Sequence, residues 1–409
     1  MNYKLDFIRS QFPALDKDWT YFDNAGGSQT LQSVAERISD YLLTSNVQLG
    51  ASYNVSQESG SRVNQGFDFG KELVNAKHRS EVIYGSSTTM LLQQLSKSLV
   101  QTFQEGDEVI VTNVDHEANV GPWLEMQDAG VNIKFWEVNK ETFELELDKL
   151  SELITEKTKL VAVTHASNVL GTIMPIKEIA ELVHDAGALL CVDAVAFAPH
   201  RLIDVQELDV DFYVFSFYKV YGPHYSLLYC KQEILECIPG INHFFIGNEE
   251  GAYKMQPGNA NFELSYGYLG YKDYLEACYS EHFDQSAKTF REKAVKVYDL
   301  FADHEEQLSK KFIEFLKTKP NVKIIGSEEW DKDIRVPTIS FIVNGTKSDE
   351  IPIQVDEYMI GIRYGDFYAR RLIESLDLMD NQGIIRVSMV HYNSLTEVDQ
   401  LIQVLDQII

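Results

Sequence analysis

Short apolar runs between residues 81 and 229 constrain the fold of this chain more than any other feature. Runs of four or five mostly apolar residues without strict alternation predict strands that are buried on both faces. Between them lie helical patterns, one of which ends at Gly187. Strands that alternate with helices predict an α/β domain with a largely parallel sheet. The predicted strands are Glu81–Tyr84, Glu108–Thr112, Leu160–Thr164, Leu189–Asp193, Phe212–Ser216 and Tyr225–Tyr229.

The pattern changes after residue 280, where a long helical pattern is followed by strands and a final helix. This α+β pattern predicts a second, smaller domain. We expect a large domain at 21–280 and a small domain formed by 1–20 together with 281–409. The elements predicted here are a helix at 283–318, strands at Val322–Ile325, Thr338–Ile342 and Ile384–Met389, and a helix at 395–409.

Composition narrows the class of protein. A chain of 409 residues is long enough for two domains. Its net charge of −26 disfavours binding to nucleic acid and to anionic membranes. The four cysteines form no CxxC pair and no histidine pair has metal-ligand spacing, so we expect no metal site and a reducing compartment. No signal core and no apolar run near the roughly 18 residues of a membrane span is present, which predicts a soluble, cytoplasmic protein.

Candidate functional residues follow the predicted strands. In open parallel sheets, ligands bind beyond the carboxyl ends of the strands. Polar residues at those positions therefore form the first set of candidates. They are Ser87, Thr88, Thr89, His116, Asn168, Asp193, Ser216 and Lys219.

Lys219 and Asp193 together indicate pyridoxal phosphate (PLP). A lysine just past a buried strand can form an imine with an aldehyde, although a solvated loop lysine is the simpler interpretation of Lys219 alone. Asp193 ends a fully apolar strand, where a carboxylate needs a cationic partner. A protonated pyridine nitrogen is such a partner. The alternative for Asp193 is capping of the next helix.

Two further features fit the same cofactor. The turn at residues 85–89 joins a strand to a helix and offers hydroxyls and backbone N–H groups at a helix N-terminus, as a phosphate site does. Simple N-capping by Ser87 or Thr88 is the alternative. His116 follows a strand and can stack on a cofactor ring and move protons, or be a structural histidine.

Taken together, these residues resemble the class V aminotransferase family of fold-type I PLP enzymes, and within it the cysteine desulfurase-like branch. The resemblance extends from YFDNAGG at Tyr21 to RVSMVHYNSLTEVD at Arg386. The motifs between them are HEANVGPW, THASNVLGTIMPI, VDAVAFAPHRLIDV, DFYVFSFYKVYGPH and GIRYGDFYA. The implied fold is a large domain with a mainly parallel sheet and a smaller α+β C-terminal domain.

The resemblance also implies roles for individual residues. Lys219 bonds to the cofactor and later moves the Cα proton, and Asp193 pairs with the pyridine nitrogen. His116 stacks on the ring, and Asn168 contacts the ring hydroxyl. The phosphate is held by Ser87, Thr88 and Ser216.

Substrate binding is implied for other positions. Arg386 binds the substrate carboxylate, with Arg363 as the next candidate, and Asn24 lines the substrate mouth. Members of the family form homodimers with shared active sites. Asn259 stands where a threonine usually completes the phosphate site of the neighbouring subunit, and its amide can donate a hydrogen bond there.

The sequence departs from the desulfurase pattern in the expected pocket. Desulfurases carry a nucleophilic cysteine after the segment that begins at Gly361, and Tyr368 falls at or near that position. A phenol cannot accept sulfur as a persulfide. Ala196 and Tyr218 replace a usual glutamine and histidine. Together these departures predict a more aromatic pocket than that of a desulfurase. We expect it to be lined by some of Tyr53, Tyr364, Phe367 and Tyr368.

These features predict a PLP-dependent enzyme that acts on a small amino acid. The first hypothesis is a desulfurase-like lyase that cleaves a C–S bond by β-elimination without a persulfide cysteine, with Tyr368 or His116 as proton donor. The second is a class V aminotransferase or an amino-acid epimerase similar to the isopenicillin N epimerase branch. The third is a protein of the same fold that serves as a partner or sensor without catalysis.

Overall fold

The computed structural model describes residues 3–284 and 286–409. The described residues form two compact units, each built from separate stretches of the chain. The first unit is drawn from Met1–Ala14, Ser28–Phe103 and Arg201–Asp299, and the second from Leu15–Gly27, Gln104–His200 and Leu300–Ile409. These units differ from the predicted division into 21–280 against 1–20 with 281–409, and that division stays a prediction.

The first unit contains strands β2 (Val82–Gly85), β8 (Ser226–Cys230) and β7 (Phe212–Ser216), hydrogen-bonded in that order. Both pairings are antiparallel, and they are the exceptions within the largely parallel arrangement that the sequence predicts. The side chains of β7 and β8 are buried on both faces, as their unbroken apolar sequences predict. The turn that leads from β2 into α4 and the turn that follows β7 are therefore both anchored to this sheet.

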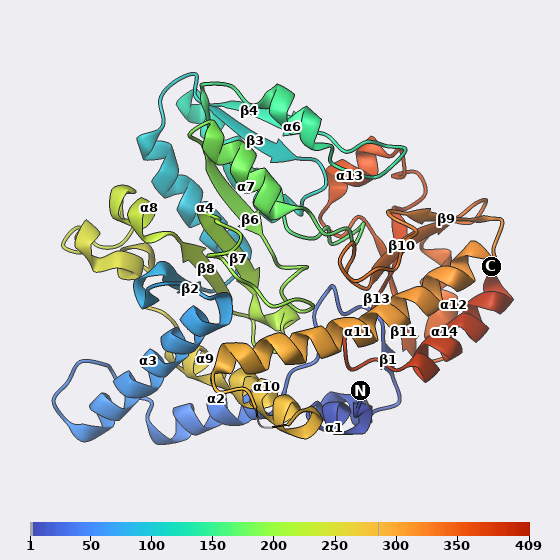
Figure 1. The fold of residues 1–409 in the computed structure, drawn as a ribbon, viewed down its shortest axis with the longest axis horizontal. Helices are drawn as coiled ribbons and strands as arrows, with labels where there is room; N and C mark the ends of the chain where they lie inside the picture. The colour runs from blue at the N-terminus through green and yellow to red at the C-terminus, as the bar shows by residue number, and fades with distance from the viewer. Residues whose placement is uncertain (1–2, 285) are drawn as a thin grey trace. The chain divides into compact units, whose positions relative to one another are not determined.

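Helices α2, α3, α9 and α10 of the first unit pack closely together (Figure 1). A Cβ atom at Gly66 in α3 would lie 2.2 Å from the Ser265 carbonyl oxygen, and one at Gly270 in α10 would lie 2.5 Å from the backbone of Ser33 and Val34. Glycine permits this close approach of helix backbones. The helices of this unit are α1 (Leu5–Ser10), α2 (Gln32–Thr44), α3 (Asn54–Val74), α4 (Thr88–Leu99), α8 (Gln232–Cys237), α9 (Phe262–Gly267) and α10 (Leu269–His282), with short 3₁₀ turns at Arg79–Glu81, Val100–Thr102, Phe217–Lys219 and Asn248–Met255.

The second unit contains a wholly parallel set of strands in the order β6-β5-β3-β4. Strand β4 was not predicted, because its sequence NIKFW mixes polar and apolar residues and only Trp136 is fully buried. Such a strand at the end of the order needs only part of its surface covered. The bounds are β3 (Glu108–Thr112), β4 (Asn132–Trp136), β5 (Thr158–Thr164) and β6 (Leu189–Asp193), and the associated helices are α5 (Gly121–Leu124), α6 (Leu147–Leu153) and α7 (Ile176–Asp185), with 3₁₀ turns at Glu117–Asn119 and Glu125–Ala129.

The C-terminal part of the second unit has an antiparallel sheet in the order β12-β13-β10-β9 and a short parallel pair, β1 with β11. Helices α11, α12 and α14 pack against this sheet (Figure 1). Phe22, from the N-terminal segment, belongs to the same apolar core. The elements are β1 (Thr20–Tyr21), β9 (Val322–Ile325), β10 (Thr338–Val343), β11 (Ile360–Gly361), β12 (Arg363–Gly365), β13 (Ile384–Ser388), α11 (Phe290–Lys317, which begins in the first unit), α12 (Glu350–Asp356), α13 (Arg370–Ser375) and α14 (Leu395–Ile408), with a 3₁₀ turn at Pro13–Asp16 where the two units divide the chain.

The predicted helix at 283–318 begins later than expected, and Gln285 within it lies outside the described residues. Helix α11 starts at Phe290 because Glu292 accepts hydrogen bonds from the backbone N–H groups of Lys288 and Thr289, at 2.7 and 3.0 Å. The Thr289 hydroxyl accepts in turn from the Glu292 N–H, which completes a capping box. Among residues 3–284 and 286–409, no helix combines the length and apolar character that crossing a bilayer demands.

Candidate functional site

Three hydroxyl groups of the first unit meet where β7 and β8 adjoin the start of α4. The Thr88 Oγ1 atom lies 2.8 Å from Ser216 Oγ, which lies 2.9 Å from Ser226 Oγ. All three side chains are buried. The sequence prediction placed Thr88 and Ser216 in one site, and the structure brings them together. The sequence analysis did not include Ser226, because this residue lies at the start of an apolar strand and not at a carboxyl end.

Ser87 is the N-cap of α4, and its Oγ atom accepts a hydrogen bond from the Met90 N–H at 3.1 Å. The capping alternative for Ser87 is therefore correct for its side chain. The first turn of α4 still presents its other N–H groups next to the hydroxyl cluster. Hydroxyls gathered at a helix N-terminus match the acceptor oxygens of a phosphate, so this part of the chain fits the phosphate of PLP.

Lys219 ends the short turn that follows β7 and is only 7% exposed. Its Nζ atom lies 5.9 Å from the centre of the Tyr218 ring, and Tyr218 stacks on His224 at 4.8 Å. The interpretation of Lys219 as a solvated loop lysine is therefore wrong. A lysine that directly follows a buried strand is placed where an aldehyde bound beyond the strand end can form an imine with it.

Asn259 has a left-handed backbone conformation, with φ of 74°, and lines a hollow of about 250 Å³. Gly85 and Ser86 from the turn before α4 line the same hollow, and the Gln256 amide donates to the Tyr84 carbonyl oxygen at 3.2 Å. The contact of Asn259 with a neighbouring subunit stays a prediction. Tyr53 is the half-exposed N-cap of α3, and its place in a pocket also stays a prediction.

In the second unit, Asp193 ends strand β6, and Asp115 lies in the segment after strand β3, with β5 between these two strands. Asp193 is buried, and its Oδ1 atom accepts from the Val195 N–H at 2.9 Å. The end of the intervening strand β5 contacts Asp115, because the Thr164 N–H donates to Asp115 Oδ2 at 3.1 Å. Burial raises the pKa of Asp115 to about 7, and the charge of Asp193 adds to this effect, against the lowering by hydrogen bonds from Thr112 and other donors. A buried carboxylate at a strand end suits a pyridinium partner.

His116 lies against the segment that follows β12. Its ring centre is 5.3 Å from that of Tyr368, which is 70% exposed. The Glu117 N–H donates to the Tyr368 carbonyl oxygen at 2.7 Å, and Arg371 forms a two-point ion pair with the Glu117 carboxylate at 2.9 and 3.0 Å. The structure therefore brings together His116 and Tyr368, the two predicted proton donors.

Arg386 lies on β13, is 2% exposed and has partners on two of its three nitrogens. Nη2 donates to Asp23 Oδ1 at 2.9 Å and Nη1 donates to the Asn168 carbonyl oxygen at 3.1 Å. Its guanidinium carbon lies 3.8 Å from the centre of the Phe367 ring, and the Asn168 amide donates to the Phe367 carbonyl oxygen at 2.9 Å. Burial lowers the pKa of Arg386, which Asp23 opposes. Arg363, the other predicted arginine, is exposed and 3.5 Å from Asp23.

Asn24 is buried and fully engaged within the second unit. Its Nδ2 atom donates to the carbonyl oxygens of Tyr21 and Ser388, each at 2.9 Å, and its Oδ1 atom accepts from the Tyr392 hydroxyl. This arrangement supports the chain segment around residue 24. Its predicted place at the substrate mouth stays a prediction.

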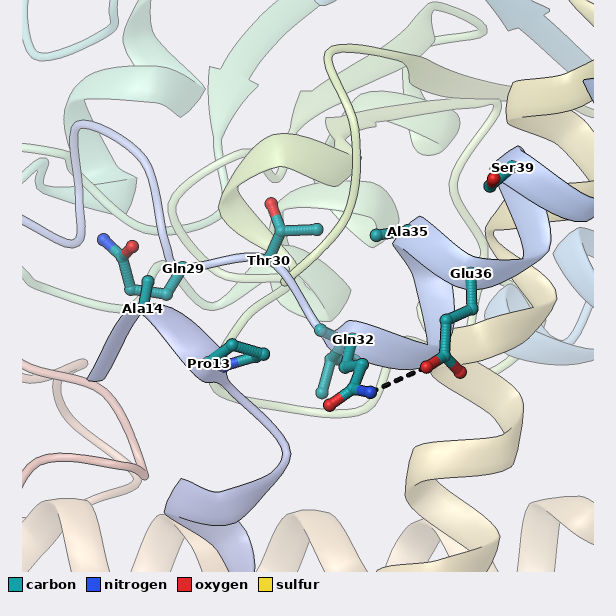
Figure 2. A pocket seen from close by; sticks show the side chains of 9 residues that line it. Pro13, Ala14, Gln29, Thr30, Gln32, Ala35, Glu36 and Ser39 are labelled. Atoms are coloured by element: carbon teal, nitrogen blue, oxygen red, sulfur yellow. Dashed lines mark hydrogen bonds between the residues drawn. The ribbon is translucent and has the colours of Figure 1, made fainter. Parts of the chain in front are cut away.

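A larger hollow lies elsewhere in the first unit, between the turn at Pro13–Asp16 and α2 (Figure 2). Its volume is about 610 Å³, and Figure 2 shows the 2.7 Å hydrogen bond from Gln32 to Glu36 on its wall. None of the predicted site residues is among those that line it. The hollow is lined by Pro13, Ala14, Gln29, Thr30, Leu31, Gln32, Ala35, Glu36 and Ser39.

Each unit thus carries one set of the predicted residues. The first unit gathers Thr88, Ser216 and the buried Lys219, and the second gathers Asn168 with Arg386 and His116 with Tyr368. Sequence reasoning missed the partner of Arg386, Asp23, and the stacking role of Phe367. The YFDN motif around Asp23 was noticed, but its carboxylate received no role.

Comparison with known proteins identifies the class. The sequence model of the family described as aminotransferase class-V matches residues 20–252 and 293–401. An aminotransferase-like protein of Gibberella zeae is 42% identical, covering 100% of this chain and 99% of the relative. A cysteine desulfurase-like protein of Aspergillus flavus is 31% identical, covering 99% of this chain and 90% of the relative. The apo structure of a cysteine desulfurase from Thermococcus onnurineus NA1 has a TM-score of 0.87 at 24% identity, covering 100% of this chain and 98% of that chain.

This chain therefore belongs to the class V aminotransferase family, in the cysteine desulfurase-like branch. Its fold is that of the fold-type I PLP enzymes, as the sequence predicts. Members of the family depend on PLP, and the prediction of a PLP-dependent enzyme is confirmed at this level.

Proposed function

We propose that this chain is a PLP-dependent lyase that expels a β-substituent, most simply sulfur, from a small cysteine-like amino acid. For L-cysteine the balanced reaction consumes one water and yields hydrogen sulfide, pyruvate and ammonia. The C–S bond and the Cα–H bond break, and the enzyme's cysteines accept no sulfur.

The observation that carries this proposal is Tyr368. It occupies the segment where a desulfurase would carry its nucleophilic cysteine, and its exposed ring lies beside His116. Cys191 is buried within β6, and burial raises the pKa of the Cys230 and Cys278 thiols, the latter to about 12. A thiol that stays protonated is a poor nucleophile. Cys237 is exposed but lies on the short helix α8.

The described residues fit the cofactor in three respects. The hydroxyl cluster at the start of α4 suits the phosphate, the buried Asp193 suits the pyridine nitrogen, and the buried Lys219 suits imine formation. When bound, PLP draws electron density away from Cα and so weakens the bonds of the substrate there. We assign Ser87, Thr88 and Ser216 to the phosphate, Asn168 to the ring hydroxyl and His116 to the ring face.

The chain's own residues would then move the protons. Lys219 takes the proton from the substrate Cα, acting as a general base. The Tyr368 hydroxyl gives a proton to the departing sulfur, with His116 as the alternative donor 5.3 Å away, ring centre to ring centre. Arg386 holds the α-carboxylate, because a buried guanidinium with an unpartnered Nε atom offers a charge-assisted contact.

The assembly and compartment belong to the same proposal. We propose a homodimer in which Asn259 donates to the phosphate of the neighbouring subunit, acting in the cytoplasm without nucleic acid or membrane. The net charge of −26 supports the absence of nucleic-acid and membrane partners, because nucleic acids and anionic membranes repel a strongly acidic protein.

Transamination is the second candidate, and the 42% identical relative described as aminotransferase-like favours it. An aminotransferase would convert the cofactor to its amine form and would need a keto acid to complete each cycle. Epimerisation, the other alternative, would leave the amino acid intact but invert it at Cα.

One experiment separates these outcomes. The visible spectrum of the PLP-loaded protein is recorded after L-cysteine, L-alanine or an S-substituted cysteine is added, and pyruvate and sulfide are measured. We expect the wild type to release pyruvate from a β-substituted substrate. The Tyr368→Phe variant should form pyruvate more slowly than the wild type does. Bleaching to the amine form, with pyruvate from L-alanine but none from the β-substituted substrates, would instead establish transamination. Persulfide on any native cysteine during turnover would contradict the proposal.

A further inference from the structure

The backbone around Asp23 is held in place from both sides. The Phe22 N–H donates to the Gly361 carbonyl oxygen at 2.8 Å, and the Ser388 N–H donates to the Phe22 carbonyl oxygen at 2.7 Å. The Asn24 N–H donates back to the Ser388 carbonyl oxygen at 3.4 Å. Asp23 therefore projects its side chain from a fixed backbone position beside the end of β13.

Gly26 leaves room for the Asp23 carboxylate. The Gly26 N–H donates to the Asp23 carbonyl oxygen at 3.0 Å, which closes a tight turn. A Cβ atom at Gly26 would lie 3.0 to 3.2 Å from the carboxylate atoms of Asp23. A side chain at position 26 would therefore force the carboxylate to shift by a few tenths of an ångström.

The Asp23 carboxylate determines which edge of Arg386 is available. It accepts one N–H from Nη2, at 2.9 Å, while Nη1 is engaged by the Asn168 carbonyl oxygen. The buried Nε atom has no hydrogen-bond partner within the described residues. Because Nη2 carries two hydrogens, the edge formed by Nε and Nη2 keeps two N–H groups for another acceptor. Two parallel N–H groups match the two oxygens of a carboxylate.

We infer that Asp23 is a positioning residue for recognition of the substrate α-carboxylate. Phe367 covers one face of the Arg386 guanidinium and so defines its plane. Asp23 fixes its rotation within that plane, so that the edge of Nε and Nη2 faces the carboxylate. This inference rests on the proposed function, in which Arg386 is the carboxylate-binding residue.

The test uses Asp23→Ala in the full-length, PLP-loaded protein. The apparent dissociation constant of L-alanine is measured from the change in the visible spectrum, with ethylamine as a probe that lacks the carboxylate. We expect the constant for L-alanine to rise about tenfold or more, as for a lost hydrogen bond to a charged group, and that for ethylamine to stay the same. Formate should fill the space of the lost carboxylate and restore L-alanine binding.

Two further variants sharpen the result. Glu374→Ala removes an exposed carboxylate that pairs with Arg370 at 2.8 Å, and it should leave both constants unchanged. Gly26→Ala keeps both charges but displaces the Asp23 carboxylate, so it should weaken L-alanine binding without rescue by formate. It also serves if Asp23→Ala does not fold. As a readout independent of PLP, formate should raise the melting temperature of Asp23→Ala protein prepared without cofactor more than that of the wild type.

The possible failures differ. If the wild type responds to L-alanine and Asp23→Ala or Gly26→Ala binds it equally well, the inference about Asp23 is wrong and the proposed function stands. If the PLP-supplied wild type responds to no amino acid, the proposed function fails and the inference fails with it.

Discussion

The stacking of Phe367 on Arg386 can be tested by the substitution Phe367→Leu. The guanidinium carbon lies 3.8 Å from the ring centre, and both side chains are buried. A desolvated cation–π contact stabilises by about 2 kcal/mol, which corresponds to a factor of about 30 in binding. Leucine keeps the apolar cover and is not β-branched, so it tolerates the left-handed backbone at this position, with φ of 53°, no worse than phenylalanine does.

We expect Phe367→Leu to weaken L-alanine binding by up to about 30-fold, because the guanidinium loses the surface that defines its plane. The measurement is the apparent dissociation constant of L-alanine, again with ethylamine as the probe without a carboxylate. Phe367→Tyr keeps an aromatic ring and is the matched control. Equal losses in the leucine and tyrosine variants, or an equal loss for ethylamine, would refute the reasoning.

Two other predictions concern the cofactor and the stability of the fold. Lys219→Ala should abolish the covalent chromophore while leaving the far-ultraviolet circular dichroism unchanged, and a retained chromophore would place the covalent link elsewhere. Burial lowers the pKa of His165 to about 3, from about 6.5 in an unfolded chain. Its contribution to stability is therefore complete above about pH 6.5 and is lost as the pH falls toward 3, by about 2 kcal/mol at pH 5. His165→Phe, which preserves the stacking on Phe197 at 3.5 Å, should reduce this acid sensitivity in denaturant titrations, and an unchanged pH dependence would contradict the assignment.

Much of the fold could be predicted because its signals are local. Strands β3, β6, β7 and β9 have the predicted bounds. In β3, β6 and β7 at least four of the five residues are buried, so the apolar character of each run reflects burial of that same run. Strand β4 could not be predicted, because a strand at the end of a sheet needs no continuous apolar sequence. The start of α11 depended on a capping contact of Glu292, which shifted the helix relative to its apolar pattern.

For the candidate site, too, the sequence predicted what depends on single residues and their immediate neighbours in the chain. The residue types at strand ends, above all Lys219 and Asp193, indicated the cofactor from the sequence alone, because such groups are rarely placed beside apolar strands without a partner. The sequence also predicted that no persulfide forms at position 368, since a phenol cannot accept sulfur. These conclusions depend only on what each residue is and on its immediate neighbours in the chain.

The tertiary structure alone decided which side chains act together. Asp23 and Arg386 are 363 positions apart, and Phe367 reaches the same guanidinium from a third segment. The burial of Lys219 and the contact of Ser226 with Ser216 were likewise invisible in the sequence. Contacts between distant segments leave no local pattern, because they depend on how helices and strands pack after each has formed. The sequence therefore determined the class of chemistry, and the packing of the chain determined how Arg386, the arginine that we propose binds the substrate carboxylate, is oriented.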